Sequence, residues 1–521
     1  MKSFLSRFQA LVFFVLSGFD RLRFCGESRL LNHAGGVNSY LYQRGILRKH
    51  FPDHCEKLTG ILRKQTDTQA DREGVPIIHL NSPSIDKEAV ALELARKHQR
   101  TSGRIALITC QESGLTFRLR KNSQGFFEPR KESIRCSHLY HYFLHQRFGL
   151  CYVRIQSWFP FTVRVGLNGR LWLARELQQR GVPFQQQRNL ITSVDDPQLA
   201  QRLLDEQTRA DWPDLLQELV EPIHPLWNFL HHEVHTPYYW MAEQSEWASD
   251  IVFRSPDDLA QWYPRWIRHG LETLQCDDVL RYFGKKMPNG CPGEVKVDFR
   301  ARVEGTRLKF WYDSNSLKFY NKEDTHQVPI ALRAENTFNH VAGFKVFRTK
   351  EGEDASAPKS WQKMRKGVAD LGRRAEIGQS INNRLLESLS TVAETTPLGK
   401  LLEPLGQPVF QDDRRIARAL NPLTGPDGEL LRALGNGDFL LNGFRNRDLR
   451  LLLHGECQDA RDRRRQAGVI TRLLRLVRVH GLIVKVQKSH RYHLSADGKR
   501  IVTALRAAHH ANVTRLQDSN P

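Results

Sequence analysis

The chain has 521 residues, enough for about three or four domains with their own hydrophobic cores. Lysine and arginine total 78 against 57 aspartate and glutamate residues, and the resulting net charge of +21 favours a polyanionic partner, nucleic acid above all. Apolar residues make up 40% and charged residues 26%, values that exclude a disordered, collagen-like or low-complexity protein.

The N-terminal region, residues 1–150, is predicted to mix helices and strands. Its longest apolar run, residues 10–19, is too short to span a bilayer. Lys2 and Arg7 precede this run as in a signal peptide, but no small-x-small cleavage motif follows it. We therefore expect a buried first helix and no membrane partner. The eight cysteines form no Cys-x-x-Cys pair, which fits a cytoplasmic location.

Three further regions follow along the chain. Residues 151–348 are expected to form an α+β core, whose clearest part is an antiparallel meander over residues 294–337 with turn-forming residues between its strands. Residues 360–402 read as a basic helical segment, and residues 428–510 as a winged helix. The predicted fold class is therefore α+β: a mixed α/β body with an antiparallel meander, plus a C-terminal winged helix-turn-helix.

Alternation along the meander predicts one polar face, because successive side chains of a strand point to opposite sides. Side chains from three strands are expected on this face: Arg307, Lys309, Lys318, Tyr320, Lys322, Arg333 and Glu335. Such a group suits phosphodiester cleavage, with Tyr320 as nucleophile, cations such as Lys318 and Arg333 for the developing charge, and an acid that holds a metal. An ordinary half-exposed sheet, or one that binds nucleic acid without cutting it, shows the same alternation.

The stretch Leu317–Lys322, followed by Leu332–Glu335, resembles the Tyr-[Asp/Asn]-Lys and Arg-x-Glu strands of rolling-circle replication initiators of the Rep_trans type. In that family the tyrosine attacks DNA and becomes linked to a 5′ phosphate, while acidic residues hold a metal. The resemblance implies that Tyr320 is the nucleophile, that Lys322 contacts phosphate and that Glu335 holds Mg²⁺ or Mn²⁺. The insertion between the two strands departs from the family spacing.

A pair of acids precedes the meander. Glu246 and Asp250 lie four residues apart, so they share one side in either a helix or a strand. Carboxylates in this position can complete a metal site with Glu335. Helix capping and surface charge are the alternatives.

The C-terminal region carries the strongest local signal. A short helix over residues 443–453 and a longer one over residues 459–480 precede two short strands, and Ser495 begins a closing helix. This order, with the Gly481-Leu482-Ile483 stop and the Arg491–Leu494 strand, resembles the winged helix-turn-helix of MarR-like regulators.

Charge agrees with a nucleic-acid-binding winged helix, since residues 443–521 contain 17 basic and 6 acidic side chains. In such domains the second helix enters the major groove and the wing approaches a neighbouring groove. The residues expected to contact duplex DNA are Arg463, Arg464, Gln466, Thr471, Arg472, Arg475, Lys488 and Arg491. A solvated basic helix, or a winged helix used for protein contacts, is the alternative.

The chain as a whole resembles a widespread bacterial family of about this length that carries a terminal winged helix and has no established activity. The resemblance lies in stretches such as His138–Tyr142, Trp158–Phe161 and Gly443–Leu449. Phosphate-binding loops, dinucleotide fingerprints and His-Glu-x-x-His motifs do not occur, which argues against a nucleotide or NAD cofactor.

Together these patterns predict a DNA-binding protein of the replication-initiator or mobile-element kind. Its winged helix would dock on duplex DNA, and its meander would handle a strand or nick it through Tyr320 with Mg²⁺ or Mn²⁺. Two alternatives stay open: a non-enzymatic transcriptional regulator, and an RNA-binding protein that stacks bases on exposed aromatic rings.

Overall fold

The computed structural model describes most of the first 510 residues, and two compact units make up this part of the chain. Its gaps are residues 273–275, 286–295, 303–304, 325–326, 351–352, 355, 391, 393–396, 436–438, 440–442 and 487–488. The first unit, here called the body, comprises Ala10–Ala260 and Asp298–Asn382, and the rest forms the winged-helix unit. None of the described helices combines the length and apolar character needed to cross a membrane.

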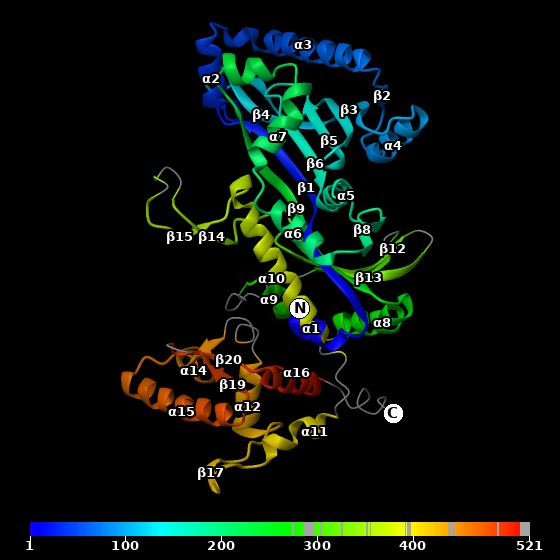
Figure 1. The fold of residues 1–521 in the computed structure, drawn as a ribbon. Coiled ribbons are helices and arrows are strands. Elements are labelled where there is room, and N and C mark those ends of the chain that lie inside the picture. The colour runs from blue at the N-terminus through cyan, green and yellow to red at the C-terminus, as the bar shows by residue number, and fades with distance from the viewer. Residues whose placement is uncertain are drawn as a thin grey trace. The chain divides into compact units, whose positions relative to one another are not determined.

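An eleven-stranded sheet forms the frame of the body, with the spatial order β10-β11-β12-β13-β9-β1-β6-β5-β4-β3-β2. Its strands are β1 (Val12–Ser28), β2 (Ile77–Leu80), β3 (Gly103–Lys121), β4 (Phe127–His145), β5 (Gly149–Gln156), β6 (Val163–Asn168), β9 (Tyr238–Phe253), β10 (Lys296–Arg302), β11 (Gly305–Tyr312), β12 (Asn315–Asp324) and β13 (Gln327–Phe338). Neighbours from β11 to β3 are antiparallel, whereas β2 and β3 are parallel. The long strands β1 and β9 run side by side through its middle (Figure 1).

Helices and two small hairpins complete the body. The helices are α2 (Ala34–Gln43), α3 (Phe51–Arg72), α4 (Lys87–Lys97), α5 (Gly169–Gln179), α6 (Pro197–Gln207), α7 (Trp212–Val220) and α10 (Leu371–Ser390). One hairpin joins β7 (Phe184–Gln187) to β8 (Leu190–Val194), and the other joins β14 (Lys345–Arg348) to β15 (Ser360–Lys363). The predicted α+β class and the antiparallel meander, which consists of β10 to β13, are confirmed.

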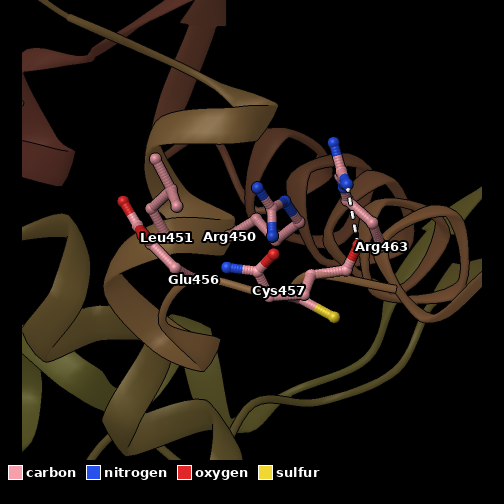
Figure 2. A pocket seen from close by; sticks show the side chains of 6 residues that line it. Arg450, Leu451, Glu456, Cys457 and Arg463 are labelled. Carbon is pink, nitrogen blue, oxygen red and sulfur yellow. Dashed lines mark hydrogen bonds between the residues drawn. The ribbon is translucent and has the colours of Figure 1, made fainter. Parts of the chain in front are cut away.

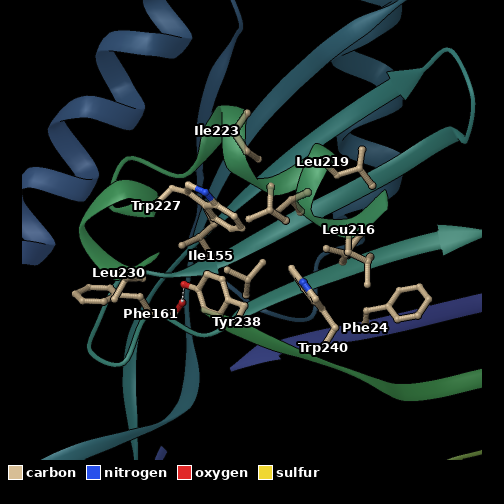
Figure 3. Packing of buried hydrophobic residues seen from close by; sticks show 14 of the residues in the cluster. Phe24, Ile155, Phe161, Leu216, Leu219, Ile223, Trp227, Leu230, Tyr238 and Trp240 are labelled. Atoms are coloured by element: carbon tan, nitrogen blue, oxygen red, sulfur yellow. Dashed lines mark hydrogen bonds between the residues drawn. The ribbon is translucent and has the colours of Figure 1, made fainter. Parts of the chain in front are cut away.

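The largest hydrophobic core is rich in aromatic rings and lies where α7 and the segment after it cover the sheet (Figure 3). Trp227, Tyr238 and Trp240 are buried there among aliphatic side chains such as Leu216. The Tyr238 hydroxyl donates a 2.7 Å hydrogen bond to the carbonyl of Phe161, which satisfies its polar end. This core fixes the end of β9 that begins at Tyr238.

Two predicted helices are strands in the structure. The apolar run at residues 10–19 enters β1, because a strand with neighbours and packing on both faces loses the alternation that marks an exposed one. Residues 360–363 form β15, and the basic helix that follows begins only at Leu371. The first segment is rich in aromatic and β-branched residues, which suit strands.

The winged-helix unit has, in the described part of residues 446–510, the order of helices and strands that the sequence predicts. Its elements are α1 (Lys2–Phe8), α8 (Pro256–Glu272), α9 (Cys276–Tyr282), α11 (Leu398–Leu402), β16 (Val409–Gln411), β17 (Arg414–Ala417), α12 (Gly425–Leu434), β18 (Phe444–Arg445), α14 (Asn446–His454), α15 (Ala460–Val479), β19 (Ile483–Lys485), β20 (Arg491–Leu494) and α16 (Ala496–His510). From α12 onward this is a winged helix, in which β18, β20 and β19 form the small sheet. Leu430, Leu474 and Ile483 belong to its core.

Candidate nucleic-acid interface and carboxylate centre

The predicted polar face of the meander exists, and strand register sets its neighbours. Lys318 on β12 lies opposite Glu335 on β13, and Tyr320 lies opposite Arg333. Across the next ladder Arg333 lies opposite Asp250 on β9. Because residues two apart share a face, one side of the sheet collects cations, carboxylates and a phenol.

A bulge in β1 adds a carboxylate that the sequence analysis does not include. Phe19 and Leu22 of β1 pair with Trp247 and Ser245 of β9, so two residues of β1, one of them Asp20, lie opposite one residue of β9. Such bulges re-aim side chains and are frequent beside functional sites. Here the bulge places Asp20 close to Glu246.

Three carboxylates meet at this point, and we call them the carboxylate centre. Asp20, Glu246 and Glu335 each offer an oxygen, and the three oxygens lie within 4.8 Å of one another. Asp20 and Glu335 are buried, whereas Glu246 is half-buried. Three oxygen donors at this spacing match the preference of Mg²⁺ and Mn²⁺.

Lys318 and Tyr320 both contact Glu335. The Lys318 Nζ lies 2.7 Å from Glu335 Oε1, and the Tyr320 hydroxyl donates a 3.1 Å hydrogen bond to Glu335 Oε2. Glu246, by contrast, makes no hydrogen bond or ion pair with any residue that the structure describes. A phenol, a cation and an acid that makes no hydrogen bond or ion pair with the described residues are thus neighbours within one site.

Arg333 is a structural cation rather than a free one. Its guanidinium is fully buried and donates to Asp250 Oδ2 at 2.9 Å and to Asp20 Oδ2 at 3.0 Å. Arg170 lies 3.0 Å from the same Asp250 oxygen. Asp250 is therefore bound by two arginines. It lies outside the carboxylate centre, although the sequence predicts that it belongs to the same metal site as Glu246 and Glu335.

The turn between β7 and β8 covers part of the centre. The Asn189 carbonyl accepts a 2.9 Å hydrogen bond from Arg333, and its side-chain amide donates to both oxygens of Asp20 at 2.6 and 2.8 Å. Asn168, which caps α5, donates to Asp20 as well. These bonds hold Asp20 in place and bury the side of the centre nearest Arg333.

Burial and neighbouring charges shift the pKa values of several groups in the carboxylate centre and beside it. Burial and the charge of Glu335 raise the pKa of Glu246 to about 8, against the opposing effect of Lys318. Burial and Glu335 also raise the pKa of the Tyr320 phenol well above its usual value. Burial, Lys318 and Arg307 lower the pKa of Lys309 to about 8.

The second candidate site is the outer face of α15. Its inner face packs Ile470, Leu474 and Val477 into the core of the unit. With a turn of about 100° per residue, the opposite face carries a row of exposed arginines that we call the arginine stripe. It consists of Arg461, Arg464, Arg465, Arg472 and Arg475. None of the five uses its side chain in a hydrogen bond or ion pair with the described residues, so their charges are available to a partner.

Other predicted DNA contacts on α15 have partners inside the helix-turn-helix. Arg463 donates a 3.2 Å hydrogen bond to the carbonyl of Gln458 in the turn before α15, beside a small pocket that Arg450 and Cys457 also line (Figure 2). The pocket borders the start of α15. The hydrogen bond of Arg463 holds the turn before this helix in place. A carbonyl oxygen binds a guanidinium more weakly than a carboxylate does.

Gln466 and Thr471 also bond within the motif. Gln466 accepts a 3.3 Å hydrogen bond from Arg450, and the Thr471 hydroxyl donates to the Ala467 carbonyl at 2.9 Å. Arg491 lies on β20 opposite Arg445. The side chain of Lys322 and all of Lys488 lie outside the described residues.

Among the described residues, the histidines of β4 belong to no group of three or more potential metal ligands. His138 and His141 are buried on β4, and the Arg104 guanidinium lies 3.0 Å from the His141 Nδ1. They are core residues. Neither a protein-family model, nor a curated protein, nor a solved structure matches this chain.

Proposed function

We propose that this chain is a cytoplasmic DNA-binding protein whose α15 docks in the major groove of duplex DNA. The observation that carries the proposal is the arginine stripe. Five exposed arginines, unpaired among the described residues, stand on the outward face of the second helix of the helix-turn-helix, the face that enters the groove in this fold. Guanidinium groups bind phosphate oxygens and guanine edges with two hydrogen bonds each.

The charge of the helix supports this role over a solvated surface. Solvated arginines commonly have acidic neighbours at helical spacing, whereas Asp462 is the only acid within α15. Concentrated positive charge of this kind is repulsive within the chain unless a polyanion binds it. The body can then act on the DNA that the winged helix holds.

The test is the affinity of the whole chain for a labelled duplex of random sequence at low salt. We expect the double variant Arg472→Ala/Arg475→Ala to bind about tenfold or more weakly, because two phosphate contacts are removed. Arg202→Ala, which removes an exposed helical arginine of the body, is the matched control and should bind as the unmodified chain does. Equal affinity of the double variant would refute the proposal.

The carboxylate centre favours a second activity, metal-dependent cleavage of a DNA strand. A divalent ion held by Asp20, Glu246 and Glu335 would neutralise charge that develops on a phosphate. The phenol proton of Tyr320 passes to Glu335, and the phenolate oxygen bonds to phosphorus. The bond from phosphorus to the 3′ oxygen breaks, the 3′ oxygen takes a proton from water, and the tyrosine keeps the 5′ phosphate.

Two features of the centre oppose the attack of Tyr320 on a phosphate as long as the turn between β7 and β8 covers the centre. Tyr320 is only 4% exposed, and burial raises the pKa of its phenol. The turn with Asn189 would have to move away from Arg333 before a phosphate could enter. A non-enzymatic regulator, with the same residues as a buried ion network, is therefore the competing function.

Incubation of the whole chain with supercoiled plasmid distinguishes a DNA-cleaving protein from a non-enzymatic regulator. If the body cleaves DNA, Mn²⁺ should produce nicked circles and protein covalently linked to DNA, and both should vanish in Tyr320→Phe. The variant Glu246→Gln should lose nicking as well while it keeps the affinity for duplex DNA. Binding without nicking in the unmodified chain would refute the cleavage and favour the regulator.

A further inference from the structure

The hairpin of β14 and β15 presents an unusual surface within the body. Its register pairs Lys345 with Lys363 and Phe347 with Trp361. Because both pairs lie on the same side of the two strands, this side consists of two lysines and two aromatic rings. All four side chains are exposed.

The aromatic rings are not placed there by packing. Phe347 is 54% and Trp361 58% exposed, and Trp361 is the most exposed of the described tryptophans. The two rings touch each other, with centroids 5.4 Å apart and planes tilted by 54°. Their apolar faces stay in contact with water, which is unfavourable unless a partner covers them.

The surroundings of the rings are cationic. The guanidinium of Arg373 on α10 lies 5.6 Å from the centre of the Trp361 ring, and its Nε donates to the Lys345 carbonyl. Residues 345–366 contain seven basic and three acidic side chains. The opposite side of the hairpin is half-buried, and there Arg348 lies 3.6 Å from the buried Asp370, which anchors the hairpin to the body.

We propose that this face of the hairpin binds single-stranded DNA, with bases stacked on Phe347 and Trp361 and phosphates on Lys345 and Lys363. The proposal rests on the proposed DNA-binding function and names a second DNA site. Exposed rings between lysines match a strand whose unpaired bases alternate with phosphates. A duplex keeps its bases stacked inside, so it cannot use the rings. An apolar protein surface would leave the flanking lysines unpaired.

The test compares two labelled probes, an oligothymidylate and a duplex, by fluorescence anisotropy with the whole chain. Trp361→Ala should weaken oligothymidylate binding by about 5- to 150-fold and leave duplex binding unchanged, since stacking on one ring is lost. Phe410→Ala is the matched control, because Phe410 is 59% exposed on another two-stranded hairpin. Lys345→Ala/Lys363→Ala should lower the salt dependence of oligothymidylate binding.

The outcomes separate this site from α15. If Trp361→Ala binds oligothymidylate as the unmodified chain does, or if Phe410→Ala loses as much affinity, the hairpin site is refuted. If the Arg472→Ala/Arg475→Ala variant still loses duplex affinity in that case, the proposed function stands without it. Tighter Trp361-dependent binding of oligouridylate than of oligothymidylate would refute DNA as the ligand and indicate RNA.

Discussion

The arginines of α15 and those of the carboxylate region show how differently the same side chain is used in two parts of the molecule. Arg472 and Arg475 stand in solvent with no partner among the described residues. Arg333 and Arg170 are buried and surrounded by carboxylates and carbonyls. A charge that already has its partners serves the fold, whereas one that lacks them is available for a ligand.

This comparison predicts its largest effect at Arg333. Arg333→Met should lower the free energy of unfolding by about 3–5 kcal/mol, because Asp20 and Asp250 lose a buried partner. Urea denaturation measures the change, with Arg202→Met as the exposed control that should stay within about 0.5 kcal/mol. A loss below about 1 kcal/mol for Arg333→Met would mean that the network is not structural.

Glu246 extends the comparison to an acid that makes no hydrogen bond or ion pair with the described residues. Its folded pKa of about 8 exceeds the unfolded value, so the native state holds a proton that the unfolded chain has released. The contribution of Glu246 to the free energy of unfolding is fully present below the unfolded pKa. It is lost as the pH rises through the folded pKa of about 8. Buried histidines such as His138, whose pKa is lowered, change the free energy of unfolding only below about pH 6.5. Lys309, whose pKa is also lowered, increases the free energy of unfolding with rising pH, but only from about pH 8 upward.

The difference in unfolding free energy between the unmodified chain and Glu246→Gln from about pH 6.5 to pH 8 therefore reports on Glu246, because groups common to both proteins, such as the Met1 amino group with its lowered pKa, cancel. The unmodified chain should lose stability over this range relative to Glu246→Gln, whose amide does not titrate. Urea denaturation at both pH values gives the difference. Parallel curves for the two proteins would show that Glu246 is ionised in the native state and that its surroundings are more polar than described.

The smallest effect concerns Gly468, which lies on the outer face of α15 between Arg465 and Arg472. A Cβ at this position would meet nothing within 4 Å, so packing gives no reason for a glycine. Gly468→Ala should stabilise the chain by about 0.5–1 kcal/mol, the usual gain inside a helix. If the helix backbone approaches DNA closely here, the same variant should weaken duplex binding. A thermal melt and an anisotropy titration measure both effects, and unchanged duplex affinity would show that no close approach occurs.

The sequence predicts those parts of the structure that local patterns encode. The meander and its polar face follow from alternation and turn residues, and the winged helix follows from capping residues and the order of short elements. The pairing of Lys318 with Glu335 needs only correct register between neighbouring strands.

What the sequence could not give depends on distant segments. Asp20 joins the carboxylate centre because of a bulge against β9, more than two hundred residues away along the chain, and the only signal for it is an acid at the end of an apolar run. The aromatic face of β14 and β15 is not predicted, because Trp361 lies in the segment 360–402, for which the sequence predicts a helix. On α15, helical geometry alone would have selected Arg461 and Arg465 over Thr471, whose hydroxyl bonds to its own helix.

The salt dependence of duplex binding tests the central claim most directly. For the unmodified chain, the logarithm of the affinity should fall linearly with the logarithm of salt concentration, and Arg472→Ala/Arg475→Ala should reduce this slope by about 1.8, or 0.9 for each lost phosphate contact. Arg202→Ala should leave it unchanged. Equal slopes for the double variant and the unmodified chain would contradict the account, because the arginine stripe would then not be where DNA binds.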